Sequence, residues 1–132
     1  MVDRRRLHDE IQDLEDEGYI VQADLKREIV KVLKFEFPTG WRPRYGNILF
    51  DLPESYHYAA PTVYFSEGMS YKGDDWTQIH RPTSLDNYDR FCINKFDWNP
   101  NRHTLTTMMK VAVVGLNNPN NPNKAYREKG II

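Results

Sequence analysis

The stretch that decides the fold is YGNILFDLPESYHYAAPTVYF, residues 45–65. Its first third alternates apolar side chains with others, and those apolar residues are Ile48, Phe50 and Leu52. A period of two over a short run is typical of a β-strand with one buried face. Residues 62–65, TVYF, form a second and shorter strand candidate. Because proline cannot donate to a strand ladder, Pro53 and Pro61 mark the ends of the connection between the two predicted strands.

Two further strands are predicted upstream of this stretch. Residues 19–25 alternate apolar and polar side chains, and residues 29–37 are rich in β-branched and aromatic ones. In the second run the spacing assigns two sets to opposite faces, namely Ile29, Leu33, Phe35 and Phe37 against Val30 and Val32. Consecutive short strands with glycine and proline in their turns favour an antiparallel meander over βαβ crossovers. We therefore expect four antiparallel strands in chain order.

A helix is predicted on each side of the meander. Near the N-terminus Asp3 is a suitable cap, Leu7 and Leu14 recur with Ile11 at helical spacing, and Gly18 is the expected end. Thr104 is expected to cap the second helix. That helix has a broad apolar stripe made of Leu105, Met108, Met109, Ala112, Val113 and Leu116, widened by Val111 and Val114. The run NNPNNPN, residues 117–123, is expected to end it and leave a short charged tail.

Residues 66–103 show no sustained period. They carry Trp76, Phe91, Phe96 and Trp98, which are too many aromatic side chains for simple disorder. A stretch of this length without regular structure is usually functional in a compact domain. We expect an ordered, irregular segment that lies over the sheet.

Composition excludes several classes of function. Lys and Arg number 18 and Asp and Glu number 19, so the net charge is −1. Scattered charges argue against nucleic acid as a partner, because non-specific binding needs a concentrated positive field. The basic triplet at residues 4–6 is expected to be solvated, since its last two arginines lie four residues before Asp9 and Glu10. The chain has four histidines, and two of them, His8 and His57, are expected at the surface.

The 132 residues suffice for one domain, residues 1–132, with a core of its own. No apolar run follows a charged start as in a secretion signal, and none approaches the roughly 20 apolar residues of a bilayer span. A single cysteine cannot form an internal disulfide, so a cytoplasmic protein without membrane contact is expected. One cysteine and scattered histidines lack the ligand spacing of a zinc site, and we expect no metal or cofactor.

Cys92 is the chain's only cysteine. Its neighbours Phe91 and Ile93 suit a buried thiol that behaves as a small hydrophobe. Its position in an irregular region just before a predicted helix suits a reactive thiol instead, because exposure and nearby backbone N–H groups favour the thiolate. Residue chemistry alone leaves both interpretations open.

The order of several landmarks resembles that of the ubiquitin-conjugating enzymes. In that family a Tyr-x-Gly-Gly strand leads to a Tyr-Pro segment and a Pro-x-Val-x-Phe strand, a His-Pro-Asn motif precedes the active cysteine, and Trp-Ser-Pro precedes the next helix. The matching positions here are, in the same order, Tyr45 and Gly46, Pro53 to Tyr56, Pro61, Val63 and Phe65, His80 and Pro82, Cys92, and Trp98 and Pro100. Pro119 and Pro122 lie in the asparagine-rich stretch that closes the second predicted helix. The resemblance covers nearly the whole chain.

The resemblance implies an α+β fold with an N-terminal helix, the four-stranded meander, a long active-site loop and a second packed helix. It also implies an enzyme that takes a ubiquitin-like protein from an activating enzyme, holds it as a thioester on Cys92, and transfers it to an amine of a protein target. The family's motif asparagine supports the transfer step. In its place we expect His80, or less directly Asn94 or His103, which are near Cys92 in the sequence. Each also suits a structural role, namely hydrogen bonds within the loop for His80 and Asn94 and stabilisation of the turn before Thr104 for His103, where this role is the favoured one.

The chain departs from the family pattern at three places. His80 is followed by Arg81 and Pro82 rather than Pro-Asn, the Tyr-Pro step reads Tyr56-His57, and the family's two C-terminal helices are expected to be missing. A compact, divergent version of this kind is similar to prokaryotic relatives. Some of those accompany ubiquitin-like conjugation cassettes, including cassettes of antiphage defence.

Two other functions remain open at this point. The first is a catalytically inactive binding module on the same fold, like the ubiquitin-conjugating variants or RWD domains, which the broken His-Pro-Asn motif favours. The second is a Cys-His hydrolase that pairs Cys92 with His80 or His103, although the chain carries no local signature of such enzymes.

Overall fold

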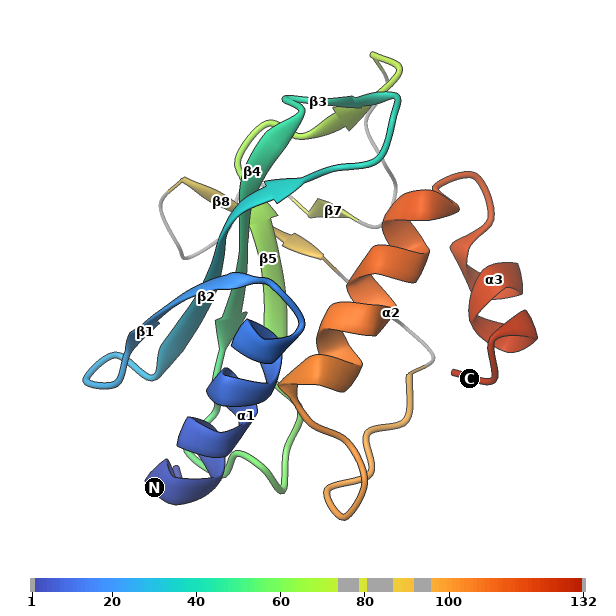
Figure 1. The fold of residues 1–132 in the computed structure, drawn as a ribbon. Helices are drawn as coiled ribbons and strands as arrows, with labels where there is room; N and C mark the ends of the chain where they lie inside the picture. The colour runs from blue at the N-terminus through green and yellow to red at the C-terminus, as the bar shows by residue number, and fades with distance from the viewer. Residues whose placement is uncertain (1, 74–78, 81–86, 92–95, 132) are drawn as a thin grey trace.

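The computed structural model describes residues 2–73, 79–80, 87–91 and 96–131. Its helices are α1 (Arg4–Asp16), α2 (Leu105–Asn117) and α3 (Pro122–Glu128), drawn in Figure 1. Its strands are β1 (Ile20–Asp24), β2 (Ile29–Glu36), β3 (Trp41–Arg42), β4 (Tyr45–Asp51), β5 (Thr62–Ser66), β6 (Ser70–Tyr71), β7 (Ile79–His80) and β8 (Tyr88–Phe91). Cys92 and Asn94 lie outside the described residues, and for His80 the description covers the backbone.

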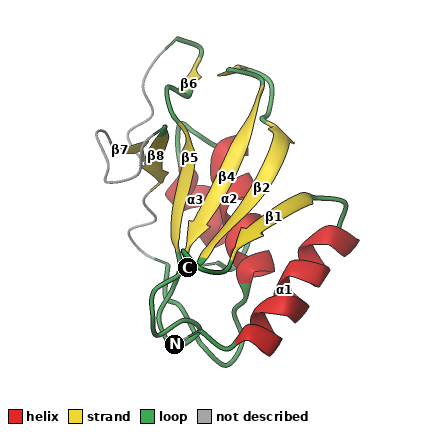
Figure 2. Cartoon of the chain, turned by 90° about the vertical axis from the view of Figure 1, so that its left-hand side faces the viewer, coloured by secondary structure: helices red, strands yellow, loops and turns green. Residues whose placement is uncertain are grey.

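Among the described residues, six strands form one antiparallel sheet in the order β1-β2-β4-β5-β8-β7, while β3 pairs with β6 apart from it. The first four strands of the large sheet follow one another in sequence, which confirms the predicted meander. Figure 2 shows α2 and α3 behind this sheet and α1 beside its β1 edge. The fold is therefore a mixed α+β arrangement with an N-terminal helix, as expected.

The main core lies between the sheet and the helices. Its buried apolar side chains include Val30, Val32, Phe37, Ile48, Phe50, Val63 and Phe65 from the sheet and Leu105, Met108, Met109, Ala112 and Leu116 from α2. Helix α1 adds Leu7 and Leu14, on the narrow stripe that its sequence predicts. A smaller cluster lies on the other face of the sheet and consists of Ile29, Leu49 and Tyr64 with Tyr88 against them.

The predicted division of β2 into two faces is confirmed before Lys34 and wrong after it. Val30 and Val32 point into the main core, Ile29 belongs to the smaller cluster, and Phe37 returns to the main core. The register with β4 shifts between Val32 and Phe35, and Lys34 between them has a left-handed φ of 54°. Such a bulge adds one residue to the strand, so every side chain after it changes face.

The predicted ends of α1 are confirmed. The Oδ1 atom of Asp3 accepts hydrogen bonds from the backbone N–H groups of Arg5 and Arg6, at 3.1 and 3.2 Å. Two of the N–H groups that have no partner inside the helix are thereby satisfied. Gly18 follows the helix with a φ of 96°, a conformation that glycine adopts at little cost.

Residues 66–103 are more regular than expected. Strand β8 pairs with β5, and β7 pairs in turn with β8, so the meander continues into this segment. Its alternation was hidden by Asp89, which is buried at 3% exposure and accepts a hydrogen bond from the N–H of Gly68 at 3.0 Å. A carboxylate on the inner face of a strand breaks the apolar pattern that predicts strands.

The charged tail is also more ordered than expected. Asn121 caps α3 by accepting from the N–H of Lys124 at 3.2 Å, and Pro122 is the first helical residue. Ala125 and Tyr126 are buried, and Tyr126 belongs to the main core. The expectation that no helix follows α2 is therefore wrong.

Candidate functional site

The described chain reaches the predicted nucleophile from both sides. Phe91, the last residue of β8, is 3% exposed, pairs with Val63 in register and stacks on Phe65 with ring centroids 5.0 Å apart. The description resumes at Phe96, which packs partly buried against the main core. Cys92 therefore follows directly from a strand that is anchored in the core, and its place itself stays a prediction.

The backbone of His80 is next to this strand. In the register of β7 and β8, His80 is opposite Arg90, and Ile79 is opposite Phe91. His80 thus lies on the strand that neighbours the residues just before Cys92. The pairing places the backbone of His80 beside β8, while a catalytic role of its side chain stays a prediction.

An aromatic cluster is centred on the segment that follows Cys92 in the sequence. Trp98 is its centre, with the ring of Tyr56 at 5.9 Å and that of His103 at 5.7 Å between centroids. Its indole Nε1 donates a hydrogen bond to the carbonyl oxygen of His57 at 2.8 Å. The cluster therefore joins the connection between β4 and β5 to the segment that follows Cys92. His57 is half-buried with a buried Nδ1, so its predicted surface position is only partly correct.

The contacts of His103 restrict what its imidazole can do. The backbone N–H of Asn99 donates to Nδ1 of His103 at 2.8 Å, and the N–H of His103 donates back to the Asn99 carbonyl at 2.8 Å. A neutral imidazole whose Nδ1 accepts a hydrogen bond carries its proton on Nε2. In this state His103 can donate a hydrogen bond but offers no free lone pair to a proton. The geometry therefore suits a donor to an oxyanion better than a general base.

A buried carboxylate is joined to the aromatic cluster through Tyr56. From the sequence this carboxylate was expected to be exposed to solvent. Glu10 is 4% exposed, and its Oε1 accepts from the hydroxyl of Tyr56 at 2.5 Å and from the N–H of Leu105 at 2.7 Å. Its Oε2 accepts from Nε of Arg6 at 3.1 Å, and another nitrogen of Arg6 donates to the carbonyl of His103 at 3.0 Å. Burial, followed by the hydrogen bond to Glu10, raises the pKa of Tyr56 far above its ordinary value.

The sequence held one signal for this cluster. Glu10 lies three residues after Leu7 and four before Leu14, which places it on the apolar stripe of α1. The reading of residues 4–6 as solvated is wrong for Arg6, which is half-buried in this network. The prediction of a solvated side chain is confirmed for Arg4 and Arg5, both of which are exposed.

A cavity of about 270 Å³ opens next to the flanks of Cys92. It is lined by Ala60, Pro61, Thr62, Val63, Arg90, Phe91, Phe96 and Met108. Most of these side chains are apolar, and the polar groups of the lining are the hydroxyl of Thr62 and the guanidinium of Arg90. Such a lining suits a short, uncharged stretch of extended chain.

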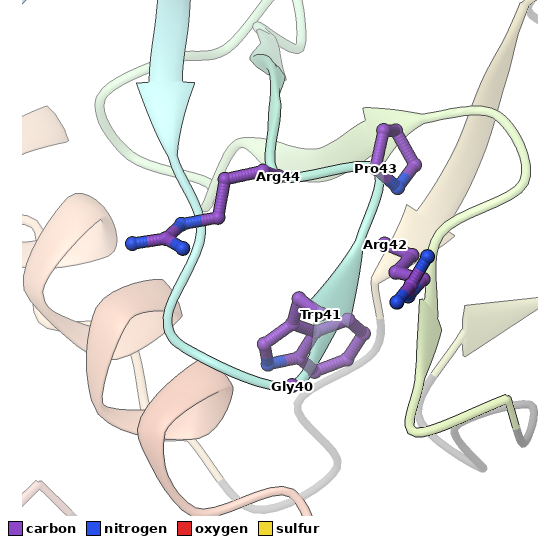
Figure 3. A pocket seen from close by; sticks show the side chains of 5 residues that line it. All are labelled: Gly40, Trp41, Arg42, Pro43 and Arg44. Atoms are coloured by element: carbon purple, nitrogen blue, oxygen red, sulfur yellow. The ribbon is translucent and has the colours of Figure 1, made fainter.

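A second cavity, of about 410 Å³, lies far from these residues at the turn between β3 and β4. Figure 3 shows Trp41 in its wall, with Arg42 and Arg44 extending to opposite sides of the turn. Arg44 already pairs with Glu36 at 2.7 Å, and the indole Nε1 of Trp41 donates to the Leu116 carbonyl at 2.8 Å. Because these polar groups diverge or are occupied within the fold, we place the functional site at the smaller cavity.

Within the described part of the chain, no three His, Cys, Asp or Glu side chains gather closely enough to hold a metal ion. In the same residues no helix has the length and apolar character needed to cross a bilayer. Comparisons with models of protein families, with curated proteins and with solved structures found no match.

Proposed function

We propose that this chain is a cysteine-dependent conjugating enzyme. Cys92 holds the C-terminus of a ubiquitin-like protein as a thioester and passes it to an amine of a protein target. The observation that carries the proposal is the contact of Trp98 with Tyr56 and with the His57 carbonyl. Two segments that the sequence resemblance matches to family landmarks are thereby brought together, and Cys92 lies between β8 and Trp98 in the sequence.

Loading and transfer each exchange one bond for another. In loading, the Cys92 thiolate attacks the carbonyl carbon of the modifier's thioester with the activating enzyme, a new C–S bond forms, and the activating enzyme's thiolate leaves. In transfer, a neutral amine attacks the carbonyl carbon of the Cys92 thioester, a C–N bond forms, the amine loses a proton to solvent, and the Cys92 thiolate leaves. A thiolate suits both steps because it is a strong nucleophile and a ready leaving group.

The transfer step needs more help than the loading step. Both pass through a tetrahedral oxyanion, but the neutral amine is a weaker nucleophile than a thiolate and must also lose a proton. One well-placed donor to such an oxyanion contributes about 2.7–4 kcal/mol. His80 is our first candidate for this donor, since its strand adjoins β8. His103 is a second candidate through its Nε2–H, and Asn94 is a third. The partners implied are an activating enzyme, a ubiquitin-like modifier and a protein target.

A small acyl donor tests the proposal without the natural partners. The folded chain is incubated with a thioester formed between a short glycine-terminated peptide and a small thiol, and intact mass spectrometry follows the protein. We expect a peptide adduct that an excess of a small thiol removes by thiol–thioester exchange, and that free lysine discharges as a peptide–lysine product. The same chain unfolded in urea measures unassisted exchange at the thiol, and its rate should be clearly lower.

Two results would contradict the proposal. No adduct above the rate of the unfolded chain would favour the inactive binding module. Release of the peptide as a free acid, with no lysine product, would favour the hydrolase.

Substitution of His80 assigns the donor. His80→Ala should slow discharge to lysine by about a hundredfold or more and slow loading clearly less, because attack by a neutral amine depends more strongly on oxyanion stabilisation than exchange between thiols does. His8→Ala is the matched control, since the His8 side chain is 81% exposed on α1. Equal slowing of both steps would remove His80 from the mechanism.

A further inference from the structure

The polar contacts around Glu10 and the aromatic contacts around Trp98 close into one ring of interactions. Starting at Glu10, the ring passes through Tyr56 to Trp98, from Trp98 to His103, and from the His103 carbonyl through Arg6 back to Glu10. It joins three segments that are far apart in the sequence: helix α1, the connection between β4 and β5, and the segment that follows Cys92. The N–H of Leu105 adds the start of α2 to the same carboxylate.

A buried charge is a costly way to join these segments if stability is its only purpose. Removing a carboxylate and a guanidinium from water costs free energy that their attraction only partly returns, so apolar side chains of similar size would hold the fold equally well. What the charged pair adds is direction, because each oxygen and nitrogen fixes the angle of its partner. The Arg6 guanidinium, with one nitrogen on Glu10 and another on a backbone carbonyl, fixes the position of residue 103 relative to α1.

We propose that Glu10 is a positioning residue for the transfer site. Through Arg6 it holds the backbone of residues 99–103, and through Tyr56 it holds the segment that receives the Trp98 hydrogen bond. Trp98 and His103 both pack against Phe96, which lines the 270 Å³ cavity together with Phe91, the residue before Cys92 in the sequence. This inference rests on the proposed function for the reaction that it serves, and on the hydrogen bonds of Glu10, Arg6, Tyr56 and Trp98 for the positioning itself.

The two steps of the reaction depend on this positioning to different degrees. Loading is an exchange between two similar thiols and needs an accessible thiolate. Aminolysis needs the amine, the carbonyl carbon and an oxyanion donor in one arrangement, and small displacements of such an arrangement cost up to about a hundredfold in rate. A loosened segment at residues 96–103 should therefore slow discharge more than loading.

Glu10→Gln is the variant of choice. The amide oxygen can still accept from Tyr56 and Leu105, while the amide nitrogen faces Nε of Arg6 as a second donor and breaks that contact. We expect discharge to lysine to slow about tenfold, with loading within about twofold. Arg6→Gln should reproduce this ratio from the other partner. Asp9→Asn and Arg5→Gln are the matched controls, since both side chains are exposed on the same helix, and both should behave as the unmodified chain.

Amide hydrogen exchange measured by NMR reports the positioning without any reaction. In Glu10→Gln the amides of Asn99 and His103 should exchange about tenfold faster, while that of Lys129, bonded to Ala125 in α3, should not change. Unchanged exchange at Asn99 and His103 would overturn the positioning. Should Glu10→Gln not fold, Arg6→Gln and Tyr56→Phe carry the same two measurements.

The outcomes separate this inference from the proposed function. Equal slowing of loading and discharge, with a lowered melting temperature, would show a purely structural role and overturn the inference. No thioester on the unmodified chain would overturn the proposed function and the role of Glu10 in it, and the exchange rates would still show whether Glu10 holds residues 99–103. Selective loss of discharge together with faster exchange supports both.

Discussion

The two ends of α2 are both held by a single side chain from a distant part of the sequence, yet in different ways. At the N-terminal end, the N–H of Leu105 donates to the buried carboxylate of Glu10, which also binds Tyr56 and Arg6. At the C-terminal end, the carbonyl of Leu116 accepts from the neutral indole of Trp41, packed against Phe37 and Tyr71. The neutral end serves the core, whereas the charged end adjoins the candidate site and directs its segments.

The largest effect is expected at the charged end. Glu10→Ala leaves the Leu105 N–H and the Tyr56 hydroxyl without their acceptor and should lower the free energy of unfolding by about 3 kcal/mol. Urea denaturation followed by circular dichroism measures this. Asp9→Ala, whose side chain is 76% exposed, is the control and should stay within about 0.5 kcal/mol. A loss below about 1 kcal/mol for Glu10→Ala would mean that the two ends do not differ as described.

An intermediate effect is expected at the neutral end. Trp41→Phe removes the donor to the Leu116 carbonyl and part of the ring volume, and should cost about 1–2 kcal/mol in the same measurement. Because this end does not adjoin the site, the ratio of discharge to loading should equal that of the unmodified chain. A selective loss of discharge in Trp41→Phe would break the distinction between the ends.

The smallest effect is expected for the hydroxyl of Tyr56. Tyr56→Phe should cost about 1 kcal/mol at neutral pH, because the phenyl ring keeps its contact with Trp98. The exposed hydroxyl of Tyr58, a side chain in the same connection, gives the matched control, and Tyr58→Phe should change the free energy of unfolding very little.

Alkaline pH sharpens this prediction. The pKa of Tyr56 is raised in the folded chain, so above about pH 10 the unfolded chain loses the phenolic proton while the folded chain keeps it. The unfolded state then binds fewer protons, and stability falls as the pH rises. The fall should be less steep in Tyr56→Phe, where only other groups such as Tyr126, whose pKa burial also raises, contribute. Equal slopes in the two proteins would contradict the buried bond to Glu10.

What the sequence predicts well is structure that repeats along the chain. The apolar spacing of Leu7 and Leu14 and the alternation at residues 48–52 found α1 and β4, since each element leaves its own period in the sequence. The bulge at Lys34 reverses the faces of the residues of β2 that follow it. The sequence did not predict this because one inserted residue leaves no mark in the composition. Helix α3 was missed because it has seven residues and follows an asparagine-proline run that reads as an end.

What the sequence hides is the partner of a charged residue. Glu10 was expected to be solvated with the arginines of residues 4–6, but it is buried and its donors include Tyr56 and Leu105. Asp89 is also buried and accepts from the distant N–H of Gly68. The candidate site depends on such distant pairs. Trp98 and His103 were recognised as single residues, whereas their joining to α1 through Arg6 could not be read from the sequence.

The most direct test of the central claim is a comparison of the unmodified chain with Cys92→Ser after acylation by the peptide thioester. We predict an adduct on the tryptic peptide that contains residue 92, which an excess of a small thiol removes from the unmodified chain by thiol–thioester exchange. In Cys92→Ser the adduct should form far more slowly and, once formed, survive the same thiol as an oxygen ester. An adduct of equal yield on Cys92→Ala, or an adduct on any other residue, would contradict a transfer reaction through this sulfur.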